Sequence, residues 1–344
     1  MNEPRHGHTS TLLGSGRVLI GFGLTKTDPL ASMEIFDAAR NEFKSLPAPG
    51  IRPRGWHRAV KLDGGRILIT GGWTHSNIAL REAAIIRPES GPTVKLKMRL
   101  GRYDHTVTPL PDGAVLITGG NDGKRALRRM ELFLPQAKIF MLLPRPMFVA
   151  RQQHTATRLR DGRVLIAGGG RGQGARYAEI FEPAERRTRL APGSMAASRG
   201  RHTATLLRSG HVLIAGGLGP KGALRSAEIF DLAASTFTLI QKKMSTERQQ
   251  HTATLLPDGR VLILGGWGKG NTLASGEMYD PALKCFVPLA SSLRYERRLH
   301  TATLLDGGKV LIAGGASDKA VLTAAEIFNI PPREKSSAKC GPPE

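Results

Sequence analysis

Residues 251–266 read HTATLLPDGRVLILGG, and this stretch recurs along the chain. Close copies are HTATRLRDGRVLIAGG from His154, HTATLLRSGHVLIAGG from His202 and HTATLLDGGKVLIAGG from His300, and weaker copies start at His8, His57 and His105. Successive repeat histidines lie 49, 48, 49, 48, 49 and 49 residues apart. A fixed period of about 20 to 50 residues indicates a repeat architecture. The seven units fill nearly all of the 344 residues, so we expect one domain without linkers.

Each unit reads as four short strands. HTATLL and VLIAGG flank a turn of Asp-Gly or Ser-Gly type, which predicts a β-hairpin. A variable loop leads to a third strand, clearest as AEIF from Ala178, Ala227 and Ala325, and the fourth strand is marked by an aromatic residue 35 positions after the histidine: Phe43, Phe140, Phe237 and Phe286. Because VLIA is apolar at consecutive positions, both faces of that strand must be buried. Radially stacked four-stranded sheets meet this need, so the sequence predicts an all-β, seven-bladed β-propeller over residues 1–332.

Paired glycines follow the second strand of six units, at 71–72, 119–120, 168–169, 216–217, 265–266 and 314–315, and the first unit has Phe22-Gly23. With the repeat length and the aromatic positions, they resemble the kelch family, and bacterial kelch-type repeats in particular. The chain departs from the usual kelch pattern by having Phe where Tyr is common: Phe36, Phe133, Phe181, Phe230 and Phe328. The resemblance implies that the first strand is innermost, and that the loops entering it and those joining strands two and three share one face around a central channel. We assign the glycines a backbone role only.

The last unit is incomplete at its end. Lys335 stands where other units have Phe, so we expect blade seven to lack its outer strand and residues 333–344 to form a flexible tail. Met1 lies seven residues before His8, as Met98, Met147, Met195 and Met244 lie before theirs. We therefore expect a cytoplasmic protein if Met1 is the true start, and a secreted one if an upstream signal is missing.

The chain is strongly basic, with 50 Lys and Arg against 28 Asp and Glu and a net charge of +22. Such a field favours anionic partners without choosing among nucleic acid, acidic polysaccharide and acidic protein. No stretch has the length of a spanning helix or a signal-peptide core, so we expect a soluble protein. Cys285 and Cys340 are the only cysteines, too few for a disulfide framework or a cysteine-rich metal site.

An arginine stands three residues before every repeat histidine, which predicts a ring of seven: Arg5, Arg54, Arg102, Arg151, Arg199, Arg248 and Arg297. A glutamate begins the third strand in six units: Glu34, Glu131, Glu179, Glu228, Glu277 and Glu326. In the second unit Ala84 takes that position and Glu82 lies nearby. An element repeated in every blade is explained more simply by the fold than by one ligand, so we favour internal pairing over an anion site. We likewise assign the seven histidines to structural hydrogen bonds, since they are too widely spaced for one metal site.

Loops that break the repeat symmetry carry more functional information. We predict a cationic, ligand-binding sector on the channel face of units three to five, made by Arg102, Lys124, Arg125, Arg128, Arg129, Arg151, Arg171, Arg176, Arg199, Arg201, Lys221 and Arg225. Solvated surface charge is the alternative. Six of the seven Trp and Tyr residues fall in or beside loops of the channel face: Trp56, Trp73, Tyr103, Tyr177, Trp267 and Tyr295. We add Trp73 and Trp267 to the candidate ligand-binding residues.

The sequence favours a binding scaffold over an enzyme. Kelch-like propellers include copper-radical galactose oxidases and sialic-acid epimerases, but the Cys-Tyr crosslink and copper ligands of the oxidases have no counterpart here. Neither a catalytic triad spacing, a phosphate loop nor a zinc-protease motif is present. We expect a monomer with no catalytic residues, metal or cofactor, binding an acidic protein segment or anionic polymer. The alternatives are a sugar-acting enzyme on this scaffold and nucleic-acid binding by net charge.

Overall fold

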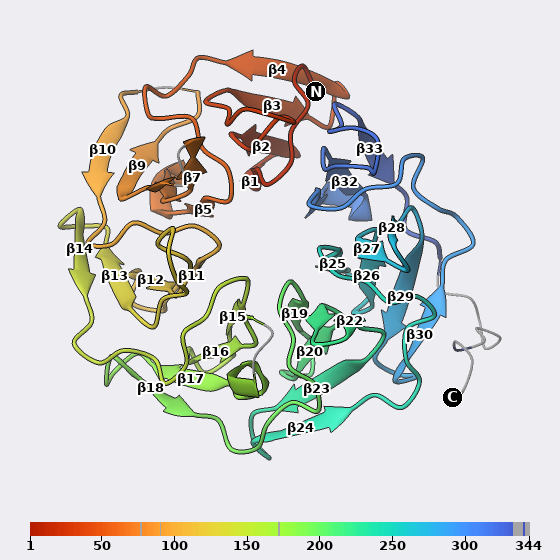
Figure 1. The fold of residues 1–344 in the computed structure, drawn as a ribbon. Coiled ribbons are helices and arrows are strands. Elements are labelled where there is room, and N and C mark those ends of the chain that lie inside the picture. The colour runs from red at the N-terminus through yellow and green to blue at the C-terminus, as the bar shows by residue number, and fades with distance from the viewer. Residues whose placement is uncertain (76–77, 90, 171–172, 333–339, 341–344) are drawn as a thin grey trace.

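The structure is a computed structural model that describes residues 1–75, 78–89, 91–170, 173–332 and 340. Seven antiparallel sheets surround a central channel, with the first strand of each sheet innermost (Figure 1). This confirms the predicted all-β, seven-bladed propeller. None of the helices in the described part has the length and apolar character needed to cross a membrane.

The first four blades each contain four strands in radial order. Blade one has β1 (Thr9–Gly14), β2 (Arg17–Gly21), β3 (Met33–Asp37) and β4 (Glu42–Leu46), and blade two has β5 (Arg58–Lys61), β6 (Ile67–Thr70), β9 (Glu82–Ile86) and β10 (Val94–Lys97). Blade three has β11 (Thr106–Pro109), β12 (Val115–Thr118), β13 (Met130–Leu134) and β14 (Ile139–Leu142), and blade four has β15 (Thr155–Arg158), β16 (Val164–Ala167), β17 (Glu179–Glu182) and β18 (Arg187–Leu190).

Blades five and six repeat this order, and blade seven has three described strands. They are β19 (Thr203–Leu206), β20 (Val212–Ala215), β23 (Ala227–Asp231) and β24 (Thr236–Leu239); β25 (Thr252–Leu255), β26 (Val261–Leu264), β29 (Gly276–Asp280) and β30 (Cys285–Pro288); and β31 (Thr301–Leu304), β32 (Val310–Ala313) and β33 (Ala325–Phe328). Small hairpins project between strands two and three: β7 (Trp73–Thr74) with β8 (Ile78–Ala79), β21 (Leu218–Gly219) with β22 (Gly222–Ala223), and β27 (Trp267–Gly268) with β28 (Asn271–Thr272). Short 3-10 turns cover Asp63–Gly65, Gln173–Arg176 and Asp306–Gly308.

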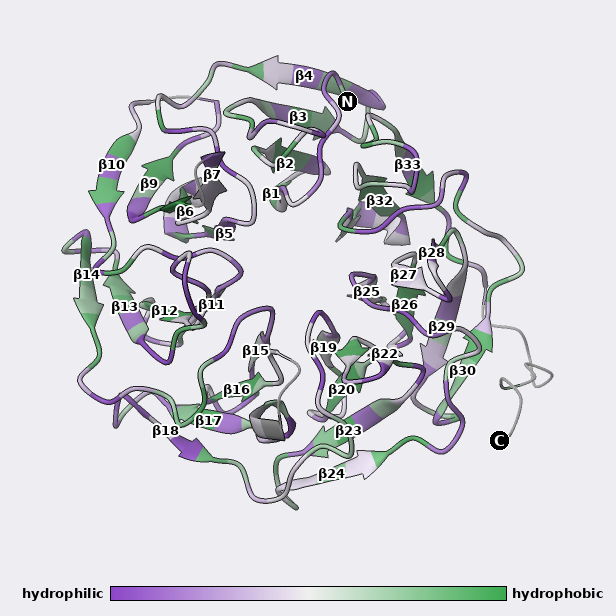
Figure 2. Cartoon of the chain, viewed as in Figure 1, coloured by the Kyte–Doolittle hydropathy of each residue, from purple (hydrophilic) through white to green (hydrophobic). Residues whose placement is uncertain are grey.

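The second strand of each blade is the centre of the core. All four residues of β16 are buried, as the unbroken apolar run predicts. Val164 and Ile166 of this strand pack with Leu116 and Leu132 of blade three, so apolar surface is buried between blades as well as within them. Burying one such side chain stabilises the fold by about 1.5–3 kcal/mol. Figure 2 shows the same division, with hydrophobic colour on second strands such as β16, β20 and β26 and largely hydrophilic loops around the channel.

The glycine pairs allow close contact between neighbouring blades. Gly71 has φ +56°, and a Cβ placed there would lie 2.2 Å from the carbonyl oxygen of Arg102 in the next blade. A side chain at this position would therefore push two blades apart. The backbone role assigned to the first glycine of the pair agrees with this geometry.

In the described residues, no strand is shared between the first and the last blade. The described part of blade seven has three strands, and the prediction from Lys335 that the outer strand is missing falls on residues outside the described ones. Ring closure joins β1 to β31, where His8 Nε2 and Thr301 Oγ1 lie 3.0 Å apart. The Met1 amino group donates to the carbonyl of Thr323 at 3.2 Å.

The predicted flexible tail falls on residues 333–339 and 341–344, which lie outside the described residues. Cys340 is described, and it forms a disulfide with Cys285, the first residue of β30. The sequence did not predict this bond. The two cysteines are 55 residues apart, so the disulfide closes a loop that contains all of blade seven.

Replacing Cys340 by Ser is expected to lower the free energy of unfolding by about 2–4 kcal/mol, because the disulfide restricts the unfolded chain. Thermal unfolding of the oxidised wild type, the reduced wild type and the variant tests this. The reduced wild type should match the variant. Equal melting temperatures for all three would show that the disulfide contributes nothing to stability.

Candidate functional site

The ring of arginines lies inside the blades. All seven side chains are 0% exposed. In six blades an Nη2 atom lies 2.6–3.1 Å from the third-strand glutamate, and in blade two Arg54 lies 3.0 Å from Glu82. The Nη1 atom of each arginine donates to a backbone carbonyl at the exit of the second strand, as Arg102 does to Gly119 at 2.6 Å. The pairing expected from the spacing is therefore present in every blade, including the substitution by Glu82.

Three candidate ligand-binding residues belong to this buried ring. Arg102, Arg151 and Arg199 are 0% exposed and pair with Glu131, Glu179 and Glu228, as Arg5, Arg54, Arg248 and Arg297 pair with theirs. A ligand on the channel face cannot reach a guanidinium that is enclosed by its own blade. Their assignment to the cationic sector is thus corrected: they occupy the structural position.

The repeat histidines join each blade to the one before it. Their Nε2 atoms lie 2.8–3.0 Å from threonine hydroxyls, for example His57 from Thr9 and His105 from Thr70. Burial lowers the pKa of all seven, to about 3 for His8, His202 and His300. They are therefore neutral at pH 7. In the described residues no cluster of three or more His, Cys, Asp or Glu could hold a metal ion.

The loop cations of blades three to five differ in their contacts. Lys124, Arg125, Arg128, Arg129, Lys221 and Arg225 are exposed, and Arg176 is half-buried. Three of these arginines, Arg128, Arg176 and Arg225, also donate from Nε to the carbonyls of Met147, Met195 and Met244, and Arg81 makes the same contact with Met98. Because this contact repeats in four successive blades, we assign these arginines an anchoring role in addition to their charge. Arg171 lies outside the described residues.

Positive charge on the second-to-third-strand loops is not restricted to blades three to five. Exposed lysines stand in these loops in five blades: Lys26, Lys124, Lys221, Lys269 and Lys319. Among the described residues, none of the five amines forms an ion pair. We call these five residues the rim lysines.

A belt of seven residues surrounds the channel mouth, one directly before each repeat histidine: Gly7, Trp56, Asp104, Gln153, Arg201, Gln250 and Leu299. All have φ between 50° and 59°, although only Gly7 is a glycine. Each backbone N–H donates to the carbonyl of the preceding belt residue, at 2.9–3.4 Å, and Gly7 completes the circle with Leu299. The belt thus holds seven dissimilar side chains at equivalent positions. The sequence signal was the position before each repeat histidine, where only Trp56 and Arg201 had been singled out.

One cavity of about 660 Å³ lies at the channel mouth. Its wall includes an aromatic corner, in which the ring of Trp56 lies 5.4 Å from Trp73 and 6.1 Å from Tyr103. Asp104 is the one acidic residue among its described lining residues. Burial raises the pKa of Asp104, while Arg58 and a 2.9 Å hydrogen bond from Gln153 Nε2 oppose the shift.

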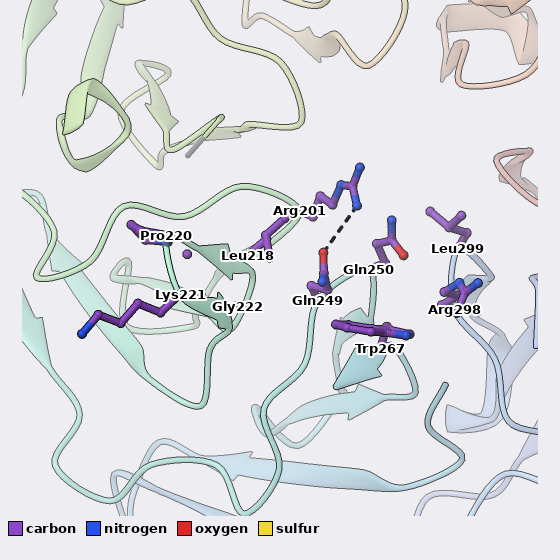
Figure 3. Close-up of a pocket in the computed structure, with 11 residues that line it drawn as sticks. Arg201, Leu218, Pro220, Lys221, Gly222, Gln249, Gln250, Trp267, Arg298 and Leu299 are labelled. Atoms are coloured by element: carbon purple, nitrogen blue, oxygen red, sulfur yellow. Dashed lines mark hydrogen bonds between the residues drawn. The ribbon is translucent and has the colours of Figure 1, made fainter. Parts of the chain in front are cut away.

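A second cavity of about 620 Å³ adjoins the first (Figure 3). Trp267, Lys221, Gln249 and Arg298 line it, and Arg201, Gln250 and Leu299 line both cavities. Arg201 Nε donates to Gln153 at 2.9 Å and Nη1 lies 3.5 Å from Gln249 Oε1. Trp73, Trp267, Lys221 and Arg201 are therefore the candidates that line a cavity. Lys124, Arg125, Arg128, Arg129, Arg176 and Arg225 line neither of these two.

Comparison with known proteins supports the resemblance of the repeats. The family model of the Kelch motif matches residues 251–292. No curated protein sequence matches the chain. Among solved structures, a fungal alcohol oxidase of the AA5 family, in complex with copper, superposes with a TM-score of 0.74. At 18% identity over 91% of this chain and 71% of that one, the likeness concerns the fold alone. The chain therefore carries a Kelch motif in its sixth repeat, within a seven-bladed β-propeller, as its repeats had implied.

Proposed function

We propose that the channel face is a binding surface for an acidic protein segment or an anionic polymer. One observation carries this proposal: within the described residues the five rim lysines form no ion pair, and one of them, Lys221, lines a cavity that shares Arg201 with the adjoining cavity at the channel mouth. An extended anion crossing the face would neutralise several rim lysines. Trp267 and the aromatic corner supply the large amphipathic side chains that are common at binding hot spots.

A second candidate function is a sugar-acting enzyme. The cavity that contains Asp104 and Arg58 supports it, because an acid of raised pKa beside a cation in a cleft is typical of functional sites. A third candidate, sequence-independent binding of nucleic acid, rests on net charge only.

Lys124, Lys221 and Lys269 changed together to Gln are expected to weaken polyglutamate binding by at least about tenfold, since each lost contact contributes about 0.5–1 kcal/mol. Fluorescence anisotropy at physiological salt measures this. The matched control changes Lys44, Lys95 and Lys97, three exposed lysines of outer strands, to Gln and removes the same charge.

The control should retain most of the affinity. Equal losses in both variants would mean diffuse attraction without a site, and no binding by the wild type would refute the proposal. Preference for single-stranded DNA over polyglutamate would favour the third candidate. Turnover of a free sugar that is lost in Asp104→Asn would favour the second.

A further inference from the structure

Among the described residues, no strand covers the outer edge of β33, whereas a fourth strand covers the same edge in the other blades. In blades one to six the third strand pairs with a fourth strand, as Phe230 of β23 does with Phe237 of β24. Within the described residues, β33 pairs with β32 alone. An uncovered strand edge presents backbone donors and acceptors that can pair with another chain.

A backbone acceptor at this edge has no described partner. Met130, Ala227 and Gly276 are the first residues of the third strands β13, β23 and β29, and Ala178 directly precedes β17. The carbonyl of each of these four residues accepts a hydrogen bond at 2.9–3.0 Å from the chain that follows the fourth strand. Ala325 holds the corresponding position in blade seven, and the described residues supply no donor to its carbonyl.

An aromatic contact is also absent from the described part of blade seven. Third-strand aromatics stack on the fourth-strand Phe in four blades, with ring centroids 4.7–5.1 Å apart. Phe328 occupies this third-strand position opposite Val310 of β32. In those four blades a Phe stands seven positions after the third-strand aromatic, whereas Lys335 stands seven positions after Phe328.

The described chain ends flank this edge without covering it. After β33 the chain runs to blade six, where the Pro331 carbonyl accepts from Arg260 and Cys340 is bonded to Cys285. At the other end, the Met1 amine donates to the backbone carbonyl of Thr323. The backbone N–H of Met244 donates in the same way to the backbone carbonyl of Arg225 in blade five. Met1 therefore lies where the chain leaves a fourth strand in the complete blades.

We propose that the outer edge of β33 binds an extended segment of a partner polypeptide, added antiparallel to the strand with an aromatic side chain opposite Phe328. Main-chain hydrogen bonds supply the affinity in this mode of recognition, and side-chain pockets supply the specificity. The partner chemistry follows from the chain's own outer strands, which read IFML in β14, TFTL in β24 and CFVP in β30. Each has its aromatic at the second position.

A fluorescein-labelled peptide with the sequence of residues 234–243, ASTFTLIQKK, tests this proposal on the full chain. It should bind saturably and slow amide exchange in Ala325–Phe328, while exchange in β23, which is already paired, stays unchanged. The control peptide ASTKPLIQKK, with Lys for the aromatic and Pro beside it, should bind at least about tenfold more weakly.

A variant of the chain carries ASTFTLIQKK fused directly before Met1. Met1 corresponds to Met244 of blade five, and residues 234–243 directly precede Met244. Filling the edge in this way should raise the melting temperature and abolish binding of the free peptide. Absence of peptide binding together with an unchanged melting temperature would overturn the proposal. So would a wild-type dimer with protected Ala325–Phe328, or peptide binding that appears only after deletion of residues 333–344, since either outcome identifies a different occupant.

Discussion

Lowering the pH from 7.5 to about 5 is expected to unfold this protein cooperatively. The seven repeat histidines are buried and neutral, and burial holds their pKa values far below the usual 6.5. In the unfolded chain they bind protons below about pH 6.5, so stability is complete above that pH and falls as the pH decreases toward the folded pKa. Each histidine contributes about 1.4 kcal/mol per pH unit, and seven together remove on the order of 10 kcal/mol by pH 5.5. That is comparable with the whole stability of a typical domain.

Guanidinium denaturation at several pH values measures this dependence. His105→Gln should reduce the slope of unfolding free energy against pH, whatever its effect on absolute stability. His75→Gln is the control, because His75 is exposed beside Asp28 and outside the ring. An unfolding free energy that is the same at pH 7.5 and pH 5.5 would contradict the prediction.

The repeat made the fold predictable. Its period, the hairpin turns and the VLIA runs each require the same four-stranded blade, so local and long-range signals agree. The Arg–Glu ring was predictable for the same reason, since both partners recur at near-fixed spacing, and even Glu82 could be named as the substitute for Ala84. The disulfide was not predictable, because pairing Cys285 with Cys340 depends on the path of the chain after β33.

The site was predicted less well than the fold. We selected cations by their position in a loop, but sequence does not show that Arg128, Arg176 and Arg225 anchor their loops on methionine carbonyls. Nor does it show which cations line a cavity. Apart from Trp56 and Arg201, the belt residues were overlooked because their side chains share no chemistry. They share only a backbone conformation that a fold imposes and that most side chains do not favour.

Replacing Arg102 by Met is expected to lower the free energy of unfolding by about 3–5 kcal/mol, because it leaves the buried carboxylate of Glu131 without its cation. Glu131 would keep the backbone donors Arg99 and Leu100, at 2.8 and 3.1 Å, but would lose charge neutralisation. The double change Arg102→Met with Glu131→Leu should recover much of the loss, since apolar residues of similar size often replace a buried ion pair without cost. Denaturant unfolding of both single variants and the double variant gives the coupling energy.

Arg125→Ala is the control for this prediction. The Arg125 side chain is 84% exposed, and its ion pair with Asp122 is long, at 3.9 Å, so its loss should change the free energy of unfolding by less than about 0.5 kcal/mol. If Arg102→Met costs no more than Arg125→Ala, the ring does not stabilise the blades, and the assignment of Arg102 to the structural position is wrong.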